Sequence, residues 1–213
     1  MTLVVVNSGI GNLGAIPNML HRIGAEAVIS DDPEVIEAAD KLILPGVGAF
    51  DAAAGRLREL ELVAVLNRKV LEQHTPVLGL CLGMQLLAEE SEEGRLPGLG
   101  WIPGRVRRFR FDPADDRAHA GAGRSLRVPH MGWNYVRAAA PTPLLEGLAD
   151  HPRFYFAHSY YLACDDDADA VGLTTYGIPF ASVVQRGNVY GAQFHPEKSH
   201  RFGLRFLENF VAL

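Results

Sequence analysis

The fold is decided by the segment TPVLGLCLGMQLLAEESEEG, residues Thr75–Gly94. Its apolar residues Pro76–Leu80 predict a buried strand, and Leu82–Glu93 predict a helix that Gly94 would end. A strand that turns directly into a helix is typical of the strand–helix–strand unit, from which parallel sheets are built. The segment therefore predicts an α/β protein.

The rest of the N-terminal half repeats this alternation. Short β-rich apolar runs predict strands at Leu3–Val6, Ala27–Ser30 and Lys41–Leu44. Between them, apolar residues at helical spacing predict helices near Leu13–Ile23, Pro33–Ala38 and Asp51–Leu71. We expect a doubly wound parallel sheet with helices on both faces.

The C-terminal half is richer in glycine, proline and aromatic residues. Shorter strands are expected in GRVRRFRF, HMGWNYV, RFYFAHSYYLA, DAVGLTTYG, FASVVQRG and NVYGAQFH. The pair Gly187-Asn188 indicates a hairpin, Asp112–Ser125 a polar surface loop, and Ser199–Val211 a closing helix. Without internal repeats, residues 1–213 are expected to form one domain with a mixed, mainly parallel sheet flanked by helices, of flavodoxin-like type.

Composition excludes several classes of function. The 213 residues are 48% hydrophobic and 21% charged, and the net charge of −5 argues against nucleic acid as a partner. No apolar run approaches the roughly 18 residues of a membrane span, and the N-terminus lacks a signal-peptide pattern. With only two cysteines we expect a cytoplasmic protein. The basic run RVRRFRF fits either a solvated strand or a surface for an acidic partner.

Cys81 is the candidate nucleophile. Gly79 and Gly83 lie two residues before and after it, which is the thiol counterpart of the G-x-S-x-G nucleophile elbow. The sharp turn leaves no room for side chains beside the nucleophile, and the N-terminus of the following helix favours thiolate. Cys164 lies among aspartates, which disfavour a thiolate, so we expect it to serve packing.

A thiolate nucleophile requires a histidine that a third group orients. His195 follows an apolar strand, and Glu197 lies two residues further on, so both side chains leave an extended backbone on one face. His158 is the rival candidate, although no carboxylate lies within two residues of it. We therefore expect His195 to be the base and Glu197 to orient it.

The segment PGVG, Pro45–Gly48, is a candidate anion site. It follows a predicted strand, and bare glycine backbone allows N–H groups to approach a substrate closely. The carboxyl ends of parallel strands meet at one sheet edge, where open α/β sheets bind ligands. The nucleophile, the base and the anion site should therefore lie together.

A dinucleotide site is a competing hypothesis from a different functional class. Gly9, Gly11 and Gly14 have the spacing G-x-G-x-x-G between a predicted strand and a helix. Asp31 and Asp32 follow about where a ribose-binding acid would fall. A third possibility is a catalytically silent binding subunit.

The motifs GLCLGMQLL, PGVGAF and HPEKS together resemble the class I glutamine amidotransferases, whose triad is Cys-His-Glu. GIGN, PHMGWN and HSYY narrow the resemblance to the glutaminase subunits of imidazole glycerol phosphate synthases. The resemblance extends from the first predicted strand to the last helix. One departure is Asn7-Ser8, where the family often has an Asp-Tyr pair.

The resemblance implies a role for each matching residue. Cys81 would attack the side-chain amide of L-glutamine, His195 would transfer protons and Glu197 would orient it, with no metal or cofactor. The backbone of Val47 and Gly48 would form the oxyanion site. The residues implied in substrate binding are Gln85, Glu93, Ser159 and Tyr160.

The resemblance also implies a partner, a (β/α)₈-barrel cyclase that forms a heterodimer with this chain and uses the ammonia to make imidazole glycerol phosphate and an aminoimidazole carboxamide ribotide. The residues implied at that interface are Asn12, Trp133, Tyr155 and Lys198. The same scaffold serves anthranilate, aminodeoxychorismate, GMP and carbamoyl phosphate synthesis, and these relatives are the alternative within the class.

Overall fold

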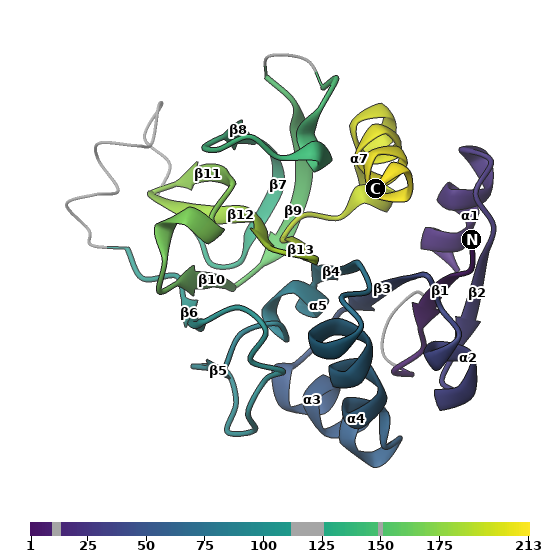
Figure 1. Cartoon of the computed structure of the whole chain (residues 1–213). Helices are drawn as coiled ribbons and strands as arrows, with labels where there is room; N and C mark the ends of the chain where they lie inside the picture. The colour runs from purple at the N-terminus through teal and green to yellow at the C-terminus, as the bar shows by residue number, and fades with distance from the viewer. Residues whose placement is uncertain (10–13, 112–125, 149–150) are drawn as a thin grey trace.

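The computed structural model of the chain describes residues 1–9, 14–111, 126–148 and 151–213. Its centre is an eight-stranded sheet in the order β2-β1-β3-β4-β13-β12-β11-β8 (Figure 1). Five neighbouring strands are parallel: β1 (Leu3–Val6), β2 (Ala27–Ser30), β3 (Lys41–Gly46), β4 (Val77–Cys81) and β13 (Val189–Ala192). Three antiparallel strands complete it: β12 (Ile178–Arg186), β11 (Gly172–Tyr176) and β8 (Arg137–Ala138). The mixed, mainly parallel sheet agrees with the prediction.

Helices cover both faces of the sheet because the parallel strands are apolar on both sides. In β1, Val4 and Val6 pack on the side of α2 (Pro33–Glu37), α3 (Phe50–Glu59) and α4 (Leu62–Asn67). Leu3 and Val5 face the opposite side, which α1 (Ala15–Arg22) and α7 (His200–Ala212) cover. This alternation between two cores is what a doubly wound fold requires.

Two smaller sheets lie beside the antiparallel end of the main sheet. One contains β10 (Tyr160–Cys164), β6 (Gly104–Arg108) and the short β5 (Glu90–Ser91). The other pairs β7 (His130–Tyr135) with β9 (Arg153–His158), antiparallel. Short 3₁₀ helices occur at Pro143–Leu145, Asp167–Asp169 and Pro196–Lys198. Strands β6, β7, β9 and β10 agree with the apolar runs predicted in the C-terminal half, and Gly187-Asn188 does join β12 to β13. Strand β5 was not predicted, because it falls inside the helix expected over Leu82–Glu93.

The single helix predicted over Asp51–Leu71 is wrong. Glu61, between α3 and α4, has φ +56°, a left-handed conformation that no α-helix continues through. A π-helix, Arg68–Glu72, then follows α4. The two-part arrangement lets the chain turn while both helices still cover the same core.

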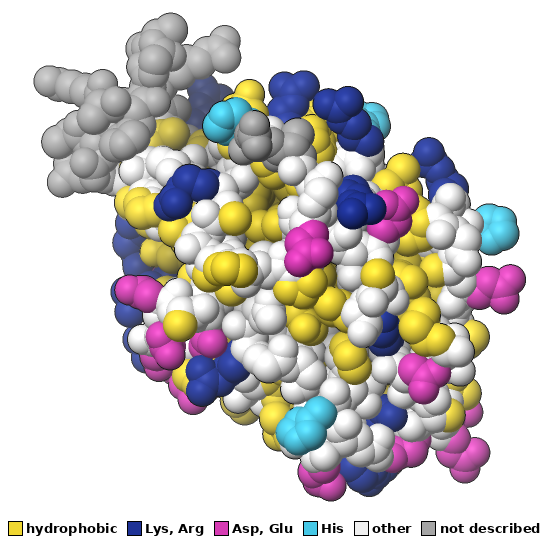
Figure 2. Space-filling view, turned by 45° about the horizontal axis from the view of Figure 1, so that its top comes forward, with side chains coloured by type: hydrophobic (Ala, Val, Ile, Leu, Met, Phe, Trp, Pro, Cys, Tyr) yellow, Lys and Arg dark blue, Asp and Glu magenta, His cyan; other side chains and the backbone are white. Residues whose placement is uncertain are grey.

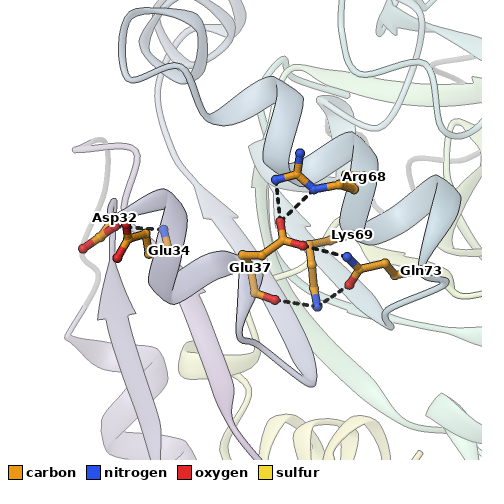
Figure 3. A network of polar contacts seen from close by, with 6 residues as sticks. All are labelled: Asp32, Glu34, Glu37, Arg68, Lys69 and Gln73. Atoms are coloured by element: carbon orange, nitrogen blue, oxygen red, sulfur yellow. Dashed lines mark hydrogen bonds and ion pairs between the residues drawn. The ribbon is translucent and has the colours of Figure 1, made fainter.

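A polar network fastens the π-helix to α2 (Figure 3). The carboxylate of Glu37 accepts from Nη2 of Arg68 at 2.6 Å and from Nε2 of Gln73 at 2.7 Å. The buried Lys69 Nζ donates to the Glu37 carbonyl oxygen and to the side chain of Gln73. Hydrogen bonding to Arg68 above all lowers the pKa of Glu37. The network satisfies a lysine that burial would otherwise leave unpaired.

The basic run behaves largely as a solvated strand. Arg105 forms an ion pair with Glu90, and Arg110 with Glu92 at 3.0 Å, all between neighbouring segments on the surface. The backbone N–H of Arg108 and the side chain of Arg110 lower the pKa of Glu92. Two of the four arginines are thus neutralised locally. In the described ranges, no helix is long and apolar enough to cross a membrane.

Candidate active site

Cys81 occupies a sharp turn at the end of β4. Its backbone has φ +53° and ψ −107°, and α5 (Leu82–Gln85) begins at the next residue. A Cβ on Gly79 would lie 2.6 Å from the carbonyl oxygen of Gly83, and one on Gly83 would lie 1.8 Å from that of Leu44. Both positions therefore require glycine, for the steric reason that the sequence pattern predicts.

The helix after Cys81 is much shorter than predicted, so the prediction of Leu82–Glu93 as one helix is wrong. The backbone N–H groups of a later segment, Gly98–Ile102, donate to the carbonyl oxygens of Leu86–Glu89 at 2.8 to 3.0 Å. Those carbonyls are then unavailable for hydrogen bonds to residues four places on. Gly94 is correspondingly no helix cap and packs closely against the Asp51 carboxylate.

His195 and Glu197 reach Cys81 from the neighbouring strand. β13 is the parallel neighbour of β4, and His195 follows it, held by a backbone bridge to Tyr155. Nδ1 of His195 lies 2.8 Å from Oε1 of Glu197, and the imidazole also hydrogen-bonds the Cys81 side chain. Because one ring nitrogen faces the carboxylate, the other is available to the sulfur. The three residues therefore lie in the order that a nucleophile, a base and a group that orients the base would require.

The electrostatics of this cluster favour a protonated imidazole. Burial lowers the pKa of His195, but the hydrogen bonds to Cys81 and Glu197 and their negative charges raise it further, to about 9. Burial raises the pKa of Glu197, and the hydrogen bond and positive charge of His195 outweigh that effect, so that this pKa falls below 4.5. The histidine is therefore a proton donor at neutral pH beside the sulfur.

A cavity of about 210 Å³ opens beside Cys81 and His195. Every residue predicted for the oxyanion site and for substrate binding lines it: Val47, Gly48, Gln85, Glu93, Ser159 and Tyr160. Gly48 has φ +102°, a backbone conformation that favours glycine. Pro129, Met131 and Ala157 also line the cavity and were not predicted. Their only signal was their position in or beside the motifs PHMGWN and HSYY.

Glu93 reaches the cavity from a loop and not from a helix. Its Oε2 accepts from the backbone N–H of Phe50, the first residue of α3, at 3.0 Å. Asp51 holds the same loop by accepting from the backbone N–H groups of Arg95 and Leu96 at 2.9 Å. These hydrogen bonds lower the pKa of Asp51. Long-range contacts therefore place Glu93 at the cavity, whereas the sequence predicted that it would lie at the end of a helix.

The rival histidine, His158, is a buried member of a neutral pair. Its Nδ1 lies 2.7 Å from the Tyr160 carbonyl oxygen, and its Nε2 lies 3.0 Å from Nδ1 of His130. Burial lowers the pKa of His158 to about 3 and that of His130 to about 4. With both ring nitrogens engaged, His158 is a wall of the cavity and is not placed to act as the base.

Gln193 was missed by the sequence reasoning. It is fully buried, its Nε2 donates to Sγ of Cys81 at 3.8 Å, and its Oε1 accepts from Nε2 of Gln85 at 3.1 Å. The available signal was its place in the sequence, two residues before His195. Cys164 shows the opposite environment: burial and then Asp169 raise its pKa to about 12, as expected for a packing cysteine.

The predicted interface residues that the structure describes lie on one surface. Trp133 is 43% exposed and stacks on His200 with a centroid distance of 5.5 Å. Lys198 lies over the ring of Tyr155 at 5.6 Å, and that ring makes an edge contact with Trp133. Figure 2, which brings the upper end of Figure 1 forward, shows hydrophobic side chains interspersed with Lys and Arg. Asn12 lies outside the described residues.

The dinucleotide hypothesis finds little to support it. Asp32 is the N-cap of α2, and its Oδ1 accepts from the backbone N–H of Glu34 at 2.9 Å (Figure 3). Gly9 has φ +70°, while Gly11 lies outside the described residues. Asp32 therefore has a local structural role.

Glu197→Gln is expected to lower the pKa of His195 toward its ordinary value of 6.5, because Nδ1 loses its charged acceptor. The raised pKa contributes stability that is complete below pH 6.5 and is lost as pH rises through about 9. The free energy of unfolding should therefore fall by about 2 kcal/mol at pH 6, the worth of a hydrogen bond to a charged group. The difference should shrink above pH 9.

This prediction is checked by NMR titration of His195 and by urea unfolding at several pH values. The control is Glu208→Gln, which removes an exposed carboxylate on α7. An unchanged His195 pKa would contradict the role given to Glu197.

Comparison with known proteins adds independent findings. The family model "Glutamine amidotransferase class-I" matches residues 4–213. The chain is 46% identical over 209 residues to "Imidazole glycerol phosphate synthase subunit HisH 2" of Methanococcus maripaludis, covering 98% of both chains. It is 49% identical over 211 residues to the protein of the same name in Pseudomonas aeruginosa, covering 99% of both. A crystal structure of a glutamine amidotransferase superposes with a TM-score of 0.71 at 23% identity, covering 98% of both chains.

Proposed function

The chain belongs to the class I glutamine amidotransferase family, and on that premise we propose that it is the glutaminase subunit of an imidazole glycerol phosphate synthase. It hydrolyses L-glutamine to glutamate and ammonia as part of a heteromeric enzyme. The observation that carries this function is the contact of Cys81 with the His195–Glu197 pair, at the mouth of a cavity lined by the predicted binding residues.

The chemistry follows from the positions of these groups. The Cys81 sulfur attacks the side-chain amide carbon of glutamine, and the backbone at Val47 and Gly48 faces the oxygen that becomes negative. The imidazolium of His195 gives its proton to the nitrogen as the carbon–nitrogen bond breaks, which releases ammonia and leaves a thioester. The neutral imidazole then takes a proton from water, whose oxygen attacks the thioester and frees glutamate.

Substrate selection rests on the other cavity residues. Oε2 of Glu93 accepts from the α3 backbone, and the half-buried carboxylate faces the cavity, where it would bind the glutamine ammonium group. Ser159 and Tyr160 line the same cavity and would close on the other end of the substrate. Gln85 would complete the wall behind the nucleophile.

Ammonia is the product that requires a partner. Free ammonia is mostly protonated near neutral pH and diffuses away, so it must be used where it is released. The proposed partner is a (β/α)₈-barrel cyclase in a cytoplasmic heterodimer, docked on the surface that carries Trp133, Tyr155 and Lys198. Aromatic residues and arginine are enriched at the centres of protein interfaces, and Arg153 lies over the exposed Trp133 ring at 5.7 Å.

The test is to purify the chain with the barrel cyclase and to measure glutamate release and imidazole glycerol phosphate formation with L-glutamine as the only nitrogen source. Both products are expected in equal amounts. A different outcome is that the chain releases glutamate without forming the cyclase product and transfers ammonia to an anthranilate or aminodeoxychorismate synthase subunit. That result would assign the chain to the other synthase. Absence of glutamate release with every partner would overturn the proposal.

A further inference from the structure

A continuous series of buried and partly buried hydrogen bonds connects strand β7 to the nucleophile. We call it the polar chain, and its members in order are Asn134, His130, His158, the Tyr160 carbonyl, Gln85 and Gln193. The four side chains from His130 to Gln193 are at most 5% exposed. Buried polar groups of this kind specify one arrangement, because displacing one leaves its neighbours unsatisfied.

The carbonyl oxygen of Tyr160 determines which ring nitrogens of the two histidines donate and which accept. This oxygen can only accept, so Nδ1 of His158 carries the proton and Nε2 accepts from Nδ1 of His130. Nε2 of His130 then accepts from Nδ2 of Asn134 at 3.3 Å. Both imidazoles are neutral in this arrangement, in agreement with their lowered pKa values.

The other half of the polar chain ends on sulfur. Nε2 of Gln85 donates to the Tyr160 carbonyl oxygen and to Oε1 of Gln193, both at 3.1 Å. Nε2 of Gln193 donates to Sγ of Cys81. Gln193 does not line the cavity, so it acts on the nucleophile and does not touch the substrate.

Strand β7 has two faces of different character. His130 is buried at the polar chain, whereas Met131, Trp133 and Tyr135 alternate with the inward residues and are 64%, 43% and 56% exposed. Trp133 belongs to the surface proposed for the partner, and Met131 also lines the cavity. A subunit that presses on the exposed face therefore acts on the strand that begins the polar chain.

We propose that the polar chain positions the Cys81 sulfur according to the placement of β7, with Gln193 as the residue that fixes the sulfur. The inference rests on the proposed function, since it concerns the same nucleophile and the same partner surface. It assigns to His130 and Gln193 a positioning role, distinct from the catalytic roles of Cys81 and His195.

Four variants of the full chain, in complex with the cyclase, test the proposal. Gln193→Met removes the donor to sulfur at similar volume, and His130→Phe removes both histidine hydrogen bonds while keeping the ring that stacks on Tyr176 at 4.1 Å. His130→Gln is the conservative rescue, because an amide can also donate and accept. The control is Ser182→Ala, which removes a buried hydrogen bond of β12 outside the polar chain.

The measurements are kcat and KM for glutamine, and the rate of Cys81 alkylation by iodoacetamide, read by peptide mass spectrometry to separate it from Cys164. We expect Gln193→Met to lower kcat about tenfold, with little change in KM, the effect of one hydrogen bond to a charged group. His130→Phe should change kcat and the alkylation rate in the same direction, and His130→Gln should restore most of both.

The double variant decides whether the two ends are connected. If both act through the polar chain, His130→Phe adds nothing to Gln193→Met, whereas independent sites would multiply their effects. Three results would each overturn the inference. The losses in kcat could multiply in the double variant, the alkylation rate could stay unchanged in His130→Phe, or Ser182→Ala could lose as much kcat as the other variants. A wild-type complex that does not hydrolyse glutamine would refute the proposed function. The alkylation rates of the variants would still show whether the polar chain positions the Cys81 sulfur.

Discussion

Cys81→Ala is expected to abolish glutamine hydrolysis, with a loss in kcat of at least about 10⁴-fold, as for other enzymes deprived of their nucleophile. Without the sulfur no thioester forms, and neither His195 nor the cavity supplies a replacement nucleophile of similar strength. The fold should persist because the substitution removes one atom from a buried site and adds none. Glutamate release by the purified complex measures the effect, and thermal unfolding monitors the fold.

Two controls separate loss of chemistry from loss of assembly. Cys164→Ala should leave kcat unchanged, because that half-buried thiol lies near aspartates and does not line the cavity. The Cys81→Ala complex supplied with an ammonium salt should still form the cyclase product, since the substitution removes only the source of ammonia. A variant that retains glutamine hydrolysis would show that Cys81 is not the nucleophile.

Gly83→Ala is expected to damage both stability and activity. Its Cβ would lie 1.8 Å from the carbonyl oxygen of Leu44 and 2.8 Å from the carbonyl carbon, which are backbone atoms that no rotamer change can move. Either β3 or α5 must shift, and we expect the free energy of unfolding to fall by about 3 kcal/mol, the upper range for overpacking a core. Urea unfolding measures it.

The shift of β3 or α5 caused by Gly83→Ala should also move the candidate catalytic groups apart. β3 leads into Val47 and Gly48, and α5 begins directly after Cys81, so either movement changes the distance between the sulfur and the oxyanion site. A displacement of about 1 Å in a catalytic group commonly costs about 10²-fold in rate. We therefore expect kcat of the folded fraction to fall by about that factor.

Gly55→Ala is the matched control for this substitution. Gly55 lies inside α3, and a Cβ there would meet Leu96 Cδ1 at 3.5 Å, an ordinary van der Waals contact. Alanine is the better helix former by about 1 kcal/mol, so the variant should be as stable as the wild type or more so. If Gly83→Ala behaves like Gly55→Ala, the steric account of the elbow is wrong.

Much of the site was predictable because its rules are local. A nucleophile between two glycines at a strand end has a steric reason that depends on a few residues. The extended backbone predicted from His195 to Glu197 is wrong, because Glu197 lies in the 3₁₀ helix Pro196–Lys198, yet the carboxylate still reaches the imidazole two residues before it. The parallel pairing of β4 with β13 then brings Cys81 and His195 together, as expected for strand ends at one sheet edge. Periodicity likewise predicts the first two helices, α1 and α2, whereas it does not reveal the break at Glu61.

Local patterns in the sequence predict the kind of fold and the candidate nucleophile, histidine and carboxylate, because periodicity and glycine spacing act within a few residues. Tertiary structure alone decided where α5 ends, how Glu93 enters the cavity and that Gln193 reaches the sulfur. Those features depend on hydrogen bonds from Gly98–Ile102 to Leu86–Glu89, from Phe50 to Glu93 and from Gln193 to Cys81. Such partners are distant along the chain, so no local pattern encodes them.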